Sequence, residues 1–295
     1  MSTPITTSTP ITTSTTAAAW SPDIHTFAPA DVIGNALVLS TSTVSGRIEG
    51  DQPMLRVAYV SDDDAQFIAE GAPIDEANPA LSEVTVATGK VATIVRLSRE
   101  QYVQQQTAGL LSDSLRRAVV KKADTAYLTQ PAPTAPAVTP PAGILLDTGI
   151  EAAAANIDTD LDPLVDLVAA LETNGATPSG ILLAPDTWAS LRKIKTATGS
   201  AATLLGAGTQ DAAMSLLGLP VRVHSAVPAG TGVVYDQAAI VSAVGDLQLA
   251  VSTDAYFASD SIAVRCTFRF GAALVRPDRI GTFSIAAAAP AAPAA

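Results

Sequence analysis

The residue types that most often carry chemistry are sparse in this chain and do not fall into a catalytic spacing. The two histidines, His25 and His224, lie far apart, and His224 follows the apolar run LPVRV, which favours a structural role. The single cysteine, Cys266, lies in a strand-like run, where a buried thiol behaves as a small hydrophobe. No phosphate-binding glycine loop or nucleophile-elbow motif occurs. The sequence therefore predicts no catalytic residue and no cofactor.

Two groups of carboxylates could suggest a metal or an acid–base pair. The three consecutive aspartates at 62–64 lack the glycine and the distal glutamate of an EF-hand loop, so a solvated turn is the better interpretation. Asp158, Asp160 and Asp162 precede a predicted helix, where the electrostatics of a helix start explains them more simply than catalysis. The sequence predicts no metal site.

Composition narrows the class of protein further. The chain has 295 residues and 48% apolar content, enough for one sizeable core or two modest ones. A net charge of -11 and a pI near 4.5 give a surface that repels nucleic acid. No apolar run is long enough to span a bilayer, and the N-terminus lacks the features of a signal peptide. We expect a soluble protein, made in a cytoplasm, without membrane contact.

A long helix is predicted over residues 98–130. Ser98 and Gln101 have the spacing of a capping box, which satisfies amide donors at a helix start. Pro131 cannot continue the helix, and the proline-rich run after it ends the element. At 1.5 Å per residue the helix would span roughly 45 Å, which suggests an elongated subunit. Apolar residues recur every three or four positions and form one stripe: Tyr102, Leu111, Leu115, Ala118, Val119, Ala123, Ala126 and Tyr127.

The segments before this helix look too poor in core residues to fold alone. Residues 1–19 carry a tandem STPITT repeat, typical of an extended arm. Residues 54–60 and 83–97 are rich in β-branched side chains and predict the two strands of a long ribbon, with an acidic stretch between them. A lone two-stranded ribbon is marginal in water. We therefore expect the arm and the ribbon to lie against another subunit.

After the helix the pattern predicts an α/β segment. Asp160 is the expected N-cap of a helix that contains Pro163 in its first turn and stops at Gly175. Further helices are predicted in PDTWASLRKIK and AAMSLLG, and strands in GILLA, LPVRV, VVYDQAAIVSAV and LQLAVS. The run SIAVRCTFRFGAALVRP predicts a long strand with Arg265 and Arg269 on one face.

Five motifs, in this order, resemble the major capsid proteins of tailed bacteriophages. They are FIAEGAPID with Glu70-Gly71, VTVATGK, and VRLSREQY leading into the long helix that contains Asp124, then LLGLPV and RCTFRFGAALVRPDRIGTF. The likeness covers roughly residues 30–285. It implies an α+β capsid fold with an N-terminal arm, an extended E-loop ribbon, a long spine helix in a P-domain, and an α/β A-domain.

The implied domain division follows the motifs. Residues 1–45 would form the arm, 46–97 the E-loop, 98–142 the spine helix and linker of the P-domain, 143–253 the A-domain, 254–285 the closing P-domain strand, and 286–295 a low-complexity tail. The likeness also implies subunit contacts at six residues: Phe67, Glu70, Gly71, Lys90, Arg265 and Arg269.

The function implied by the resemblance is structural and not enzymatic. The chain would self-assemble into hexamers and pentamers of an icosahedral shell around a double-stranded DNA genome, enclosed without sequence-specific binding. A portal and a separate scaffold or decoration protein are expected partners, and the shell would form in the host bacterial cytoplasm. Two alternatives remain open: an encapsulin shell around a cargo enzyme, and a soluble α/β enzyme or binding module.

Some members of this family join their subunits through a Lys–Asn isopeptide bond, and this chain lacks the residues for it. The loop between the ribbon strands has no lysine, Lys90 lies on the returning strand, and no asparagine follows Asn174. We predict that purified shells run as a single monomer band on a denaturing gel. A ladder of covalent multimers would contradict this prediction.

Overall fold

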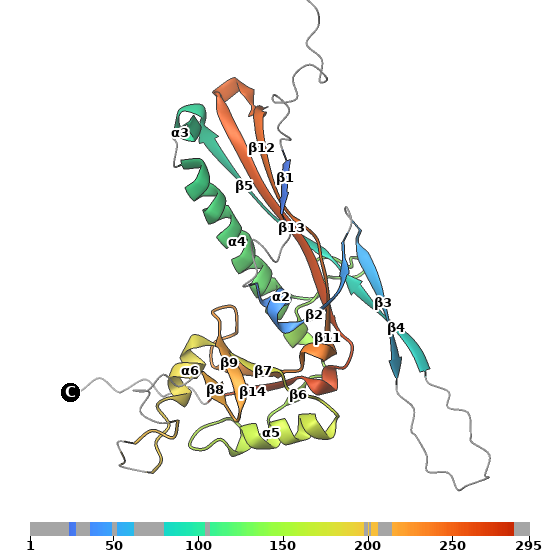
Figure 1. The fold of residues 1–295 in the computed structure, drawn as a ribbon, viewed down its shortest axis with the longest axis vertical. Helices are drawn as coiled ribbons and strands as arrows, with labels where there is room; N and C mark the ends of the chain where they lie inside the picture. The colour runs from blue at the N-terminus through green and yellow to red at the C-terminus, as the bar shows by residue number, and fades with distance from the viewer. Residues whose placement is uncertain are drawn as a thin grey trace, which may run out of the picture.

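The computed structural model describes residues 24–27, 36–48, 52–61, 80–103, 107–197, 200, 202–205 and 214–285. These residues form an elongated body, with a long helix beside one sheet, a second sheet at one end, and a two-stranded ribbon that leaves the side of the body (Figure 1). The predicted mixed class of helices and strands is confirmed.

The α-helices are α2 Leu37–Thr41, α3 Arg99–Val103, α4 Thr107–Thr129, α5 Asp162–Thr173 and α6 Pro185–Leu191. The strands are β1 Ile24–Phe27, β2 Thr43–Arg47, β3 Met54–Ser61, β4 Ala80–Ala87, β5 Gly89–Ser98, β6 Glu151–Ala152, β7 Gly180–Leu183, β8 Ser215–Leu216, β9 Leu219–Val223, β10 Thr231–Tyr235, β11 Ile240–Val244, β12 Leu247–Tyr256, β13 Ser261–Leu274 and β14 Gly281–Ser284. Four single-turn 3₁₀ helices are η1 Ile144–Leu146, η2 Gln237–Ala239, η3 Phe257–Ser259 and η4 Pro277–Arg279.

The first sheet is organised around β13, whose 14 residues confirm the predicted long strand. Its order is β1-β12-β13-β11-β2, and β5 pairs antiparallel with β13 over ten residues. The helix α4 packs on one face of this sheet through a buried stripe of residues four apart: Leu115, Val119, Ala123 and Tyr127. The sheet, α4 and α2 together bury the largest apolar cluster that the structure describes.

Thr88 divides what the sequence predicts as one ribbon strand over residues 83–97. The part before it, β4, pairs with β3, whereas the part after it, β5, leaves the ribbon and joins β13. Thr88 is buried; its amide donates to the Pro53 carbonyl at 2.8 Å and its hydroxyl donates to the Gln52 carbonyl at 2.7 Å. Arg269 in turn donates to the Thr88 hydroxyl at 3.0 Å. These bonds fix the point at which the chain changes sheet.

The helix predicted over residues 98–130 begins where the capping box places it, because α3 starts at Arg99, directly after Ser98. Ser98 itself is the last residue of β5, where it pairs with Ser261. The helical residues form two elements, α3 and α4, and residues 104–106 between them lie outside the described part of the chain. Arg99 then donates its amide to the Asp260 carbonyl at 3.2 Å and its guanidinium to the Asp260 carboxylate at 2.6 Å. The separate α4 has 23 residues, about 35 Å at the usual helical rise. Its end at Thr129, before the proline-rich run, is as predicted.

The second sheet has the order β6-β14-β10-β7-β9-β8 and carries α5 and α6. Its own buried cluster includes β7, which confirms the predicted GILLA strand. The helix α5 ends as predicted, since Gly175 adopts a φ of +76° just past it. Its start differs from the prediction: Leu161 occupies the N-cap position without a side-chain bond, and Asp160 accepts only a 3.3 Å bond from the Asp162 amide.

Two further helix predictions in this part of the chain are wrong in extent or kind. The helix α6 stops at Leu191, after which the Lys193 amide donates to the Ser190 carbonyl at 2.9 Å and the Ile194 amide to the Leu191 carbonyl at 3.3 Å, three residues back instead of four. The run AAMSLLG does not end in a helix: β8 turns back into β9 through Leu217 and Gly218, which both have a positive φ. Two such residues match a tight hairpin turn and cannot continue a right-handed helix.

None of the helices in the described part of the chain is long and apolar enough to cross a bilayer.

Candidate functional site

The structure places only half of the six residues that the sequence predicts at subunit contacts. Phe67, Glu70 and Gly71 fall in the segment between β3 and β4, outside the described residues. Lys90 is exposed on β5, and both Arg265 and Arg269 lie on β13, the former exposed and the latter half-buried. The contacts themselves stay predictions, because a single chain does not test them.

Lys90 and Arg269 lie directly opposite each other across the β5–β13 pair. Arg265 lies four residues along the same strand, opposite Ile94. Like charges directly opposite each other on one sheet face repel, which costs stability unless an anion lies nearby. The pairing thus brings together two of the predicted contact residues at a position that favours a negatively charged partner.

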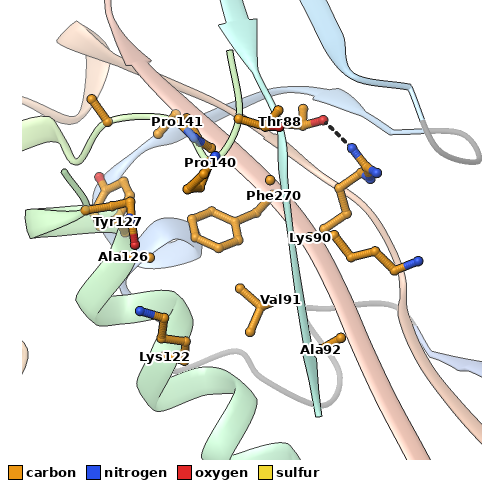
Figure 2. Close-up of a pocket in the computed structure, with 16 residues that line it drawn as sticks. Thr88, Lys90, Val91, Ala92, Lys122, Ala126, Tyr127, Pro140, Pro141 and Phe270 are labelled. Atoms are coloured by element: carbon orange, nitrogen blue, oxygen red, sulfur yellow. Dashed lines mark hydrogen bonds between the residues drawn. The ribbon is translucent and has the colours of Figure 1, made fainter. Parts of the chain in front are cut away.

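A cavity of about 610 Å³ opens beside this cationic pair, between α4, β5, β13 and the chain at 139–142. Figure 2 shows Phe270 between the helix and β5, with Tyr127 and Pro140 beside it. Lys122 projects from α4 on one side, and Lys90 lies on the other side of β5. The volume is that of a typical ligand or side-chain pocket.

The cavity has apolar walls, with Lys122 beside them on the helix, and none of the described residues that line it is acidic. Lys90 and Arg269 also line it, but they lie on the sheet face opposite to Phe270, because neighbouring residues in a strand alternate between faces. Neither the cavity nor a role for Lys122 was predicted from the sequence. The walls combine residues 88–92, 122–142 and 269–272, which are distant from one another in the chain, so no local pattern could have shown the cavity.

A buried carboxylate on α4, two residues after Lys122, joins three parts of the chain. Asp124 is only 1% exposed. One of its oxygens accepts from the Leu37 amide at the start of α2 at 2.8 Å. The other lies 3.3 Å from Nε2 of His224, in the loop after β9. Asp124 therefore links the long helix to α2 and to the second sheet.

The hydrogen bonds define the form of His224. Its Nδ1 accepts from the Ala226 amide at 3.1 Å, so in the neutral ring the hydrogen lies on Nε2, the nitrogen 3.3 Å from the Asp124 carboxylate. Burial raises the pKa of Asp124, and the Leu37 amide and His224 offset only part of that rise. The structural role predicted for His224 is consistent with this geometry. In the sequence, Asp124 itself could have indicated this junction. A carboxylate next to the apolar stripe of a helix is expected to be buried together with a polar partner.

Hydroxyl groups add a second link beside Asp124. The Tyr127 and Thr41 hydroxyls lie 2.9 Å apart, and Ser42 donates to the Ser242 hydroxyl at 2.8 Å. Burial raises the pKa of Tyr127 well above its ordinary value, so its hydroxyl keeps its proton. These contacts tie α2 to both α4 and β11.

The remaining described residues that could carry chemistry are better explained by structural roles. Burial raises the pKa of the Cys266 thiol, which keeps it protonated and a poor nucleophile. No three His, Cys, Asp or Glu side chains in the described part of the chain converge as metal ligands. The aspartates at 62–64 lie outside that part.

The sequence matches the model of the phage capsid family over residues 37–284, most of the chain. No curated protein is significantly similar to the chain in sequence.

Solved structures agree with this match at the level of the fold. A chain from Gordonia phage Cozz superposes with a TM-score of 0.66 at 17% identity, covering 86% of this chain and 87% of that one. A chain described as the capsid of a native GTA particle gives 0.65 at 19% identity, covering 85% and 90%. A chain from Mycobacterium phage Bobi gives 0.64 at 16% identity, covering 95% and 100%.

The sheet with its long helix, the side ribbon and the second α/β sheet are thus a capsid-protein fold. The chain belongs to the phage capsid family. It is a structural major capsid protein of the tailed-phage type, with its place in the capsid of the virion and its function in self-assembly into a capsid shell. The resemblance seen in the sequence motifs is confirmed.

Replacing Asp124 by alanine tests the buried junction. We expect Asp124→Ala to lower the free energy of unfolding by about 2–4 kcal/mol, because the Leu37 amide and His224 Nε2–H lose their shared acceptor. The loss should be largest at acid pH, since the folded protein holds the Asp124 proton above the ordinary pKa of 3.8. The difference in unfolding free energy between the two proteins should become smaller as pH rises through the raised pKa of Asp124. Denaturant unfolding across pH measures both effects.

Asp113→Ala is the matched control, since Asp113 lies on the same helix, exposed, and pairs only at 3.4 Å with Arg116. Its effect should stay within about 0.5 kcal/mol. Equal losses for the two variants would show that the Asp124 junction does not stabilise the fold.

Proposed function

We propose that this chain builds an icosahedral shell of hexamers and pentamers that encloses a double-stranded DNA genome. The observation that carries the proposal is the match to the phage capsid family across residues 37–284. That the similar GTA capsid is described with C5 symmetry agrees with five-fold rings of such a fold. The shell assembles in the cytoplasm of a host bacterium. The role of the chain is structural and not enzymatic.

Surfaces that one subunit leaves uncovered support the proposal. The ribbon β3–β4 leaves the side of the body with only its base packed, against a small cluster around Val86 and Val241 (Figure 1). At the end of the body where β12 turns into β13, Phe257 is 85% exposed, and Leu110 near the start of α4 is 69% exposed. Exposed large apolar side chains at the extremities of an elongated subunit are suited to contacts with neighbouring copies.

The partners of the shell follow from the same role. A portal protein, and a separate scaffold or decoration protein, complete the assembly. Packaged DNA is enclosed without sequence-specific binding, which suits a chain with a net charge of -11. Phe67, Glu70, Gly71, Lys90, Arg265 and Arg269 take part in subunit contacts.

We also propose the division into an arm at 1–45, an E-loop at 46–97, a P-domain from 98–142 and 254–285, an A-domain at 143–253 and a tail at 286–295. The pairing of β5 with β13 changes one border of this division, because it joins residues 89–97 to the body that holds the long helix.

The encapsulin alternative is not favoured, because the matching family model is that of phage capsids. Electron microscopy of the purified full-length protein separates the remaining classes. We expect closed particles at high concentration. A protein that stays a monomer under all assembly conditions would contradict the proposal.

Phe257 provides a local test of assembly. We expect Phe257→Ser to lower the fraction of subunits in particles, because an exposed ring no longer becomes buried between copies. The melting temperature of the dissociated subunit should not change, since the ring is not packed within it. Sedimentation and light scattering at matched concentrations measure assembly.

Phe257→Tyr keeps the ring and serves as the control, with assembly close to that of the unmodified chain. If Phe257→Ser assembles at the same concentration as the unmodified chain, the ring does not take part in a contact.

A further inference from the structure

The first sheet has an outer face that lies away from α4 and carries exposed cations. Residues that pair across two strands share a face, and neighbours along a strand alternate between faces. Lys90 and Arg96 of β5 therefore lie on the same face as Arg265 of β13, opposite to Phe270, which is buried with α4. All three cations are exposed. Among the described residues that pair between β5, β13 and β12, none is acidic.

An exposed apolar side chain lies among these cations. Ile94 of β5 is 56% exposed and pairs directly with Arg265. Arg96 lies two residues further along β5, and its guanidinium carbon is 4.8 Å from the centre of the Tyr256 ring, a cation–π contact that holds the charge on this face. Lys90 lies four residues before Ile94. We call Lys90, Ile94, Arg96 and Arg265 the cationic face.

The ribbon covers a different part of the same side of the sheet. Its base lies at Gly271 of β13, where an added Cβ would collide with the Ala87 carbonyl. Arg265 lies six residues away on the same strand, about 20 Å at the usual rise. Like charges gathered on one sheet face repel one another, and Ile94 leaves apolar area in water. A negatively charged partner with an apolar side chain would relieve both costs.

A surface of opposite charge lies on α5. Between Lys122 and Arg192 the chain contains nine acidic residues and neither lysine nor arginine. Asp162 and Asp166 are exposed one turn apart on this helix, and Val165 beside them is 46% exposed. Neither carboxylate takes part in an ion pair among the described residues. Together with one more exposed carboxylate they form the acidic face of α5: Asp162, Val165, Asp166 and Glu172.

The two faces agree in length and in arrangement. The cationic face extends over six residues of strand from Lys90 to Arg96, about 20 Å. The acidic face extends over ten residues of helix from Asp162 to Glu172, about 15 Å. Each face surrounds one exposed apolar side chain with charges of a single sign. An apolar centre with a polar rim is the usual plan of a contact between proteins.

The acidic face does not reach the cationic face of its own chain. Figure 1 shows α5 at the end of the body opposite to the turn between β12 and β13. Buried leucines fix this helix on the second sheet: Leu164, Leu167 and Leu171. A second copy therefore has to supply the acidic face.

We infer that α5 of one copy docks on the cationic face of another, with Val165 against Ile94 and the carboxylates of the helix against the three cations. The inference rests on the proposed function and names one contact between shell subunits. Because the two faces differ, the contact is head-to-tail, and each copy gives its α5 to one neighbour and receives that of another. Such contacts close rings when the rotation between subunits allows it.

An exchange of charges tests the contact in the full-length chain. Arg265→Glu and Asp166→Lys should each raise the concentration needed for half-maximal assembly at least about tenfold, the factor that corresponds to 1.4 kcal/mol. The chain with both substitutions again brings opposite charges together, so it should assemble at a lower concentration than either single variant. Light scattering and sedimentation measure assembly. A double variant that assembles no better than the single ones would overturn the inference.

Lys121→Glu is the matched control for charge reversal, because Lys121 is exposed on α4 and belongs to neither face. It should assemble like the unmodified chain. If Lys121→Glu and Arg265→Glu raise the assembly concentration equally, the effect comes from net charge alone and the inference is wrong.

Cross-linking locates the contact without altering any charge. The chain with Ile94→Cys is mixed with the chain with Val165→Cys, assembled, and treated with a short bismaleimide, while the native Cys266 is buried. A link between positions 94 and 165 then joins two different copies by necessity. We expect this link in mixed particles and not in dissociated subunits. Mixed particles without the link would overturn the inference.

The outcomes also separate this inference from the proposed function. Closed particles that form normally from Arg265→Glu would leave the shell role intact and remove this contact. If the same variant assembles normally but loses binding to a double-stranded DNA oligonucleotide, the cationic face is a phosphate site and the inference is wrong. If the unmodified chain forms no particles, both proposals fail.

Discussion

The buried carboxylate of Asp124 is the interaction on which the arrangement of this subunit depends. It lies on the long helix, accepts from the backbone of α2, and lies 3.3 Å from His224 in the loop after β9 of the second sheet. Burying a charge is costly unless its hydrogen-bond partners are fixed. The three parts therefore have to meet in one geometry, and a shift of any of them leaves a polar group unsatisfied.

The other residues of the body bury their apolar side chains in two clusters around this junction. The cluster between α4 and the first sheet and the cluster of the second sheet are each large enough to hold their own layers together. The ribbon has only a small cluster at its base, because β4 leaves it at Thr88 to become β5. Gly271 permits this change of direction: an added Cβ there would collide with the Ala87 carbonyl. The subunit thus has a stable centre and an extension with little support of its own.

Local patterns in the sequence were enough for the elements whose neighbours in the chain determine them. The long strand at β13, the buried strand β7 and the end of α4 before its prolines are examples. The errors lie where a distant partner decides. Thr88 donates to the Gln52 carbonyl and accepts from Arg269, so the single ribbon strand predicted over residues 83–97 is in fact two strands that join different sheets.

The candidate site shows the same division. Lys90 and Arg269 stood out in the motifs, and the sheet register then placed them opposite each other. The cavity, which Lys122 also lines, and the junction at Asp124 each combine residues that lie more than 80 positions apart in the sequence. No periodicity or spacing within one segment contains that information.

We expect the body of this subunit to be complete in itself and its ribbon to be completed by other copies. Amide hydrogen exchange, compared between assembled particles and dissociated subunits, tests this. The amides of β13 and α4 should be strongly protected in both states, whereas those of β3 and β4 should gain protection only on assembly. Ribbon amides that exchange at the same rate in particles and in free subunits would contradict it.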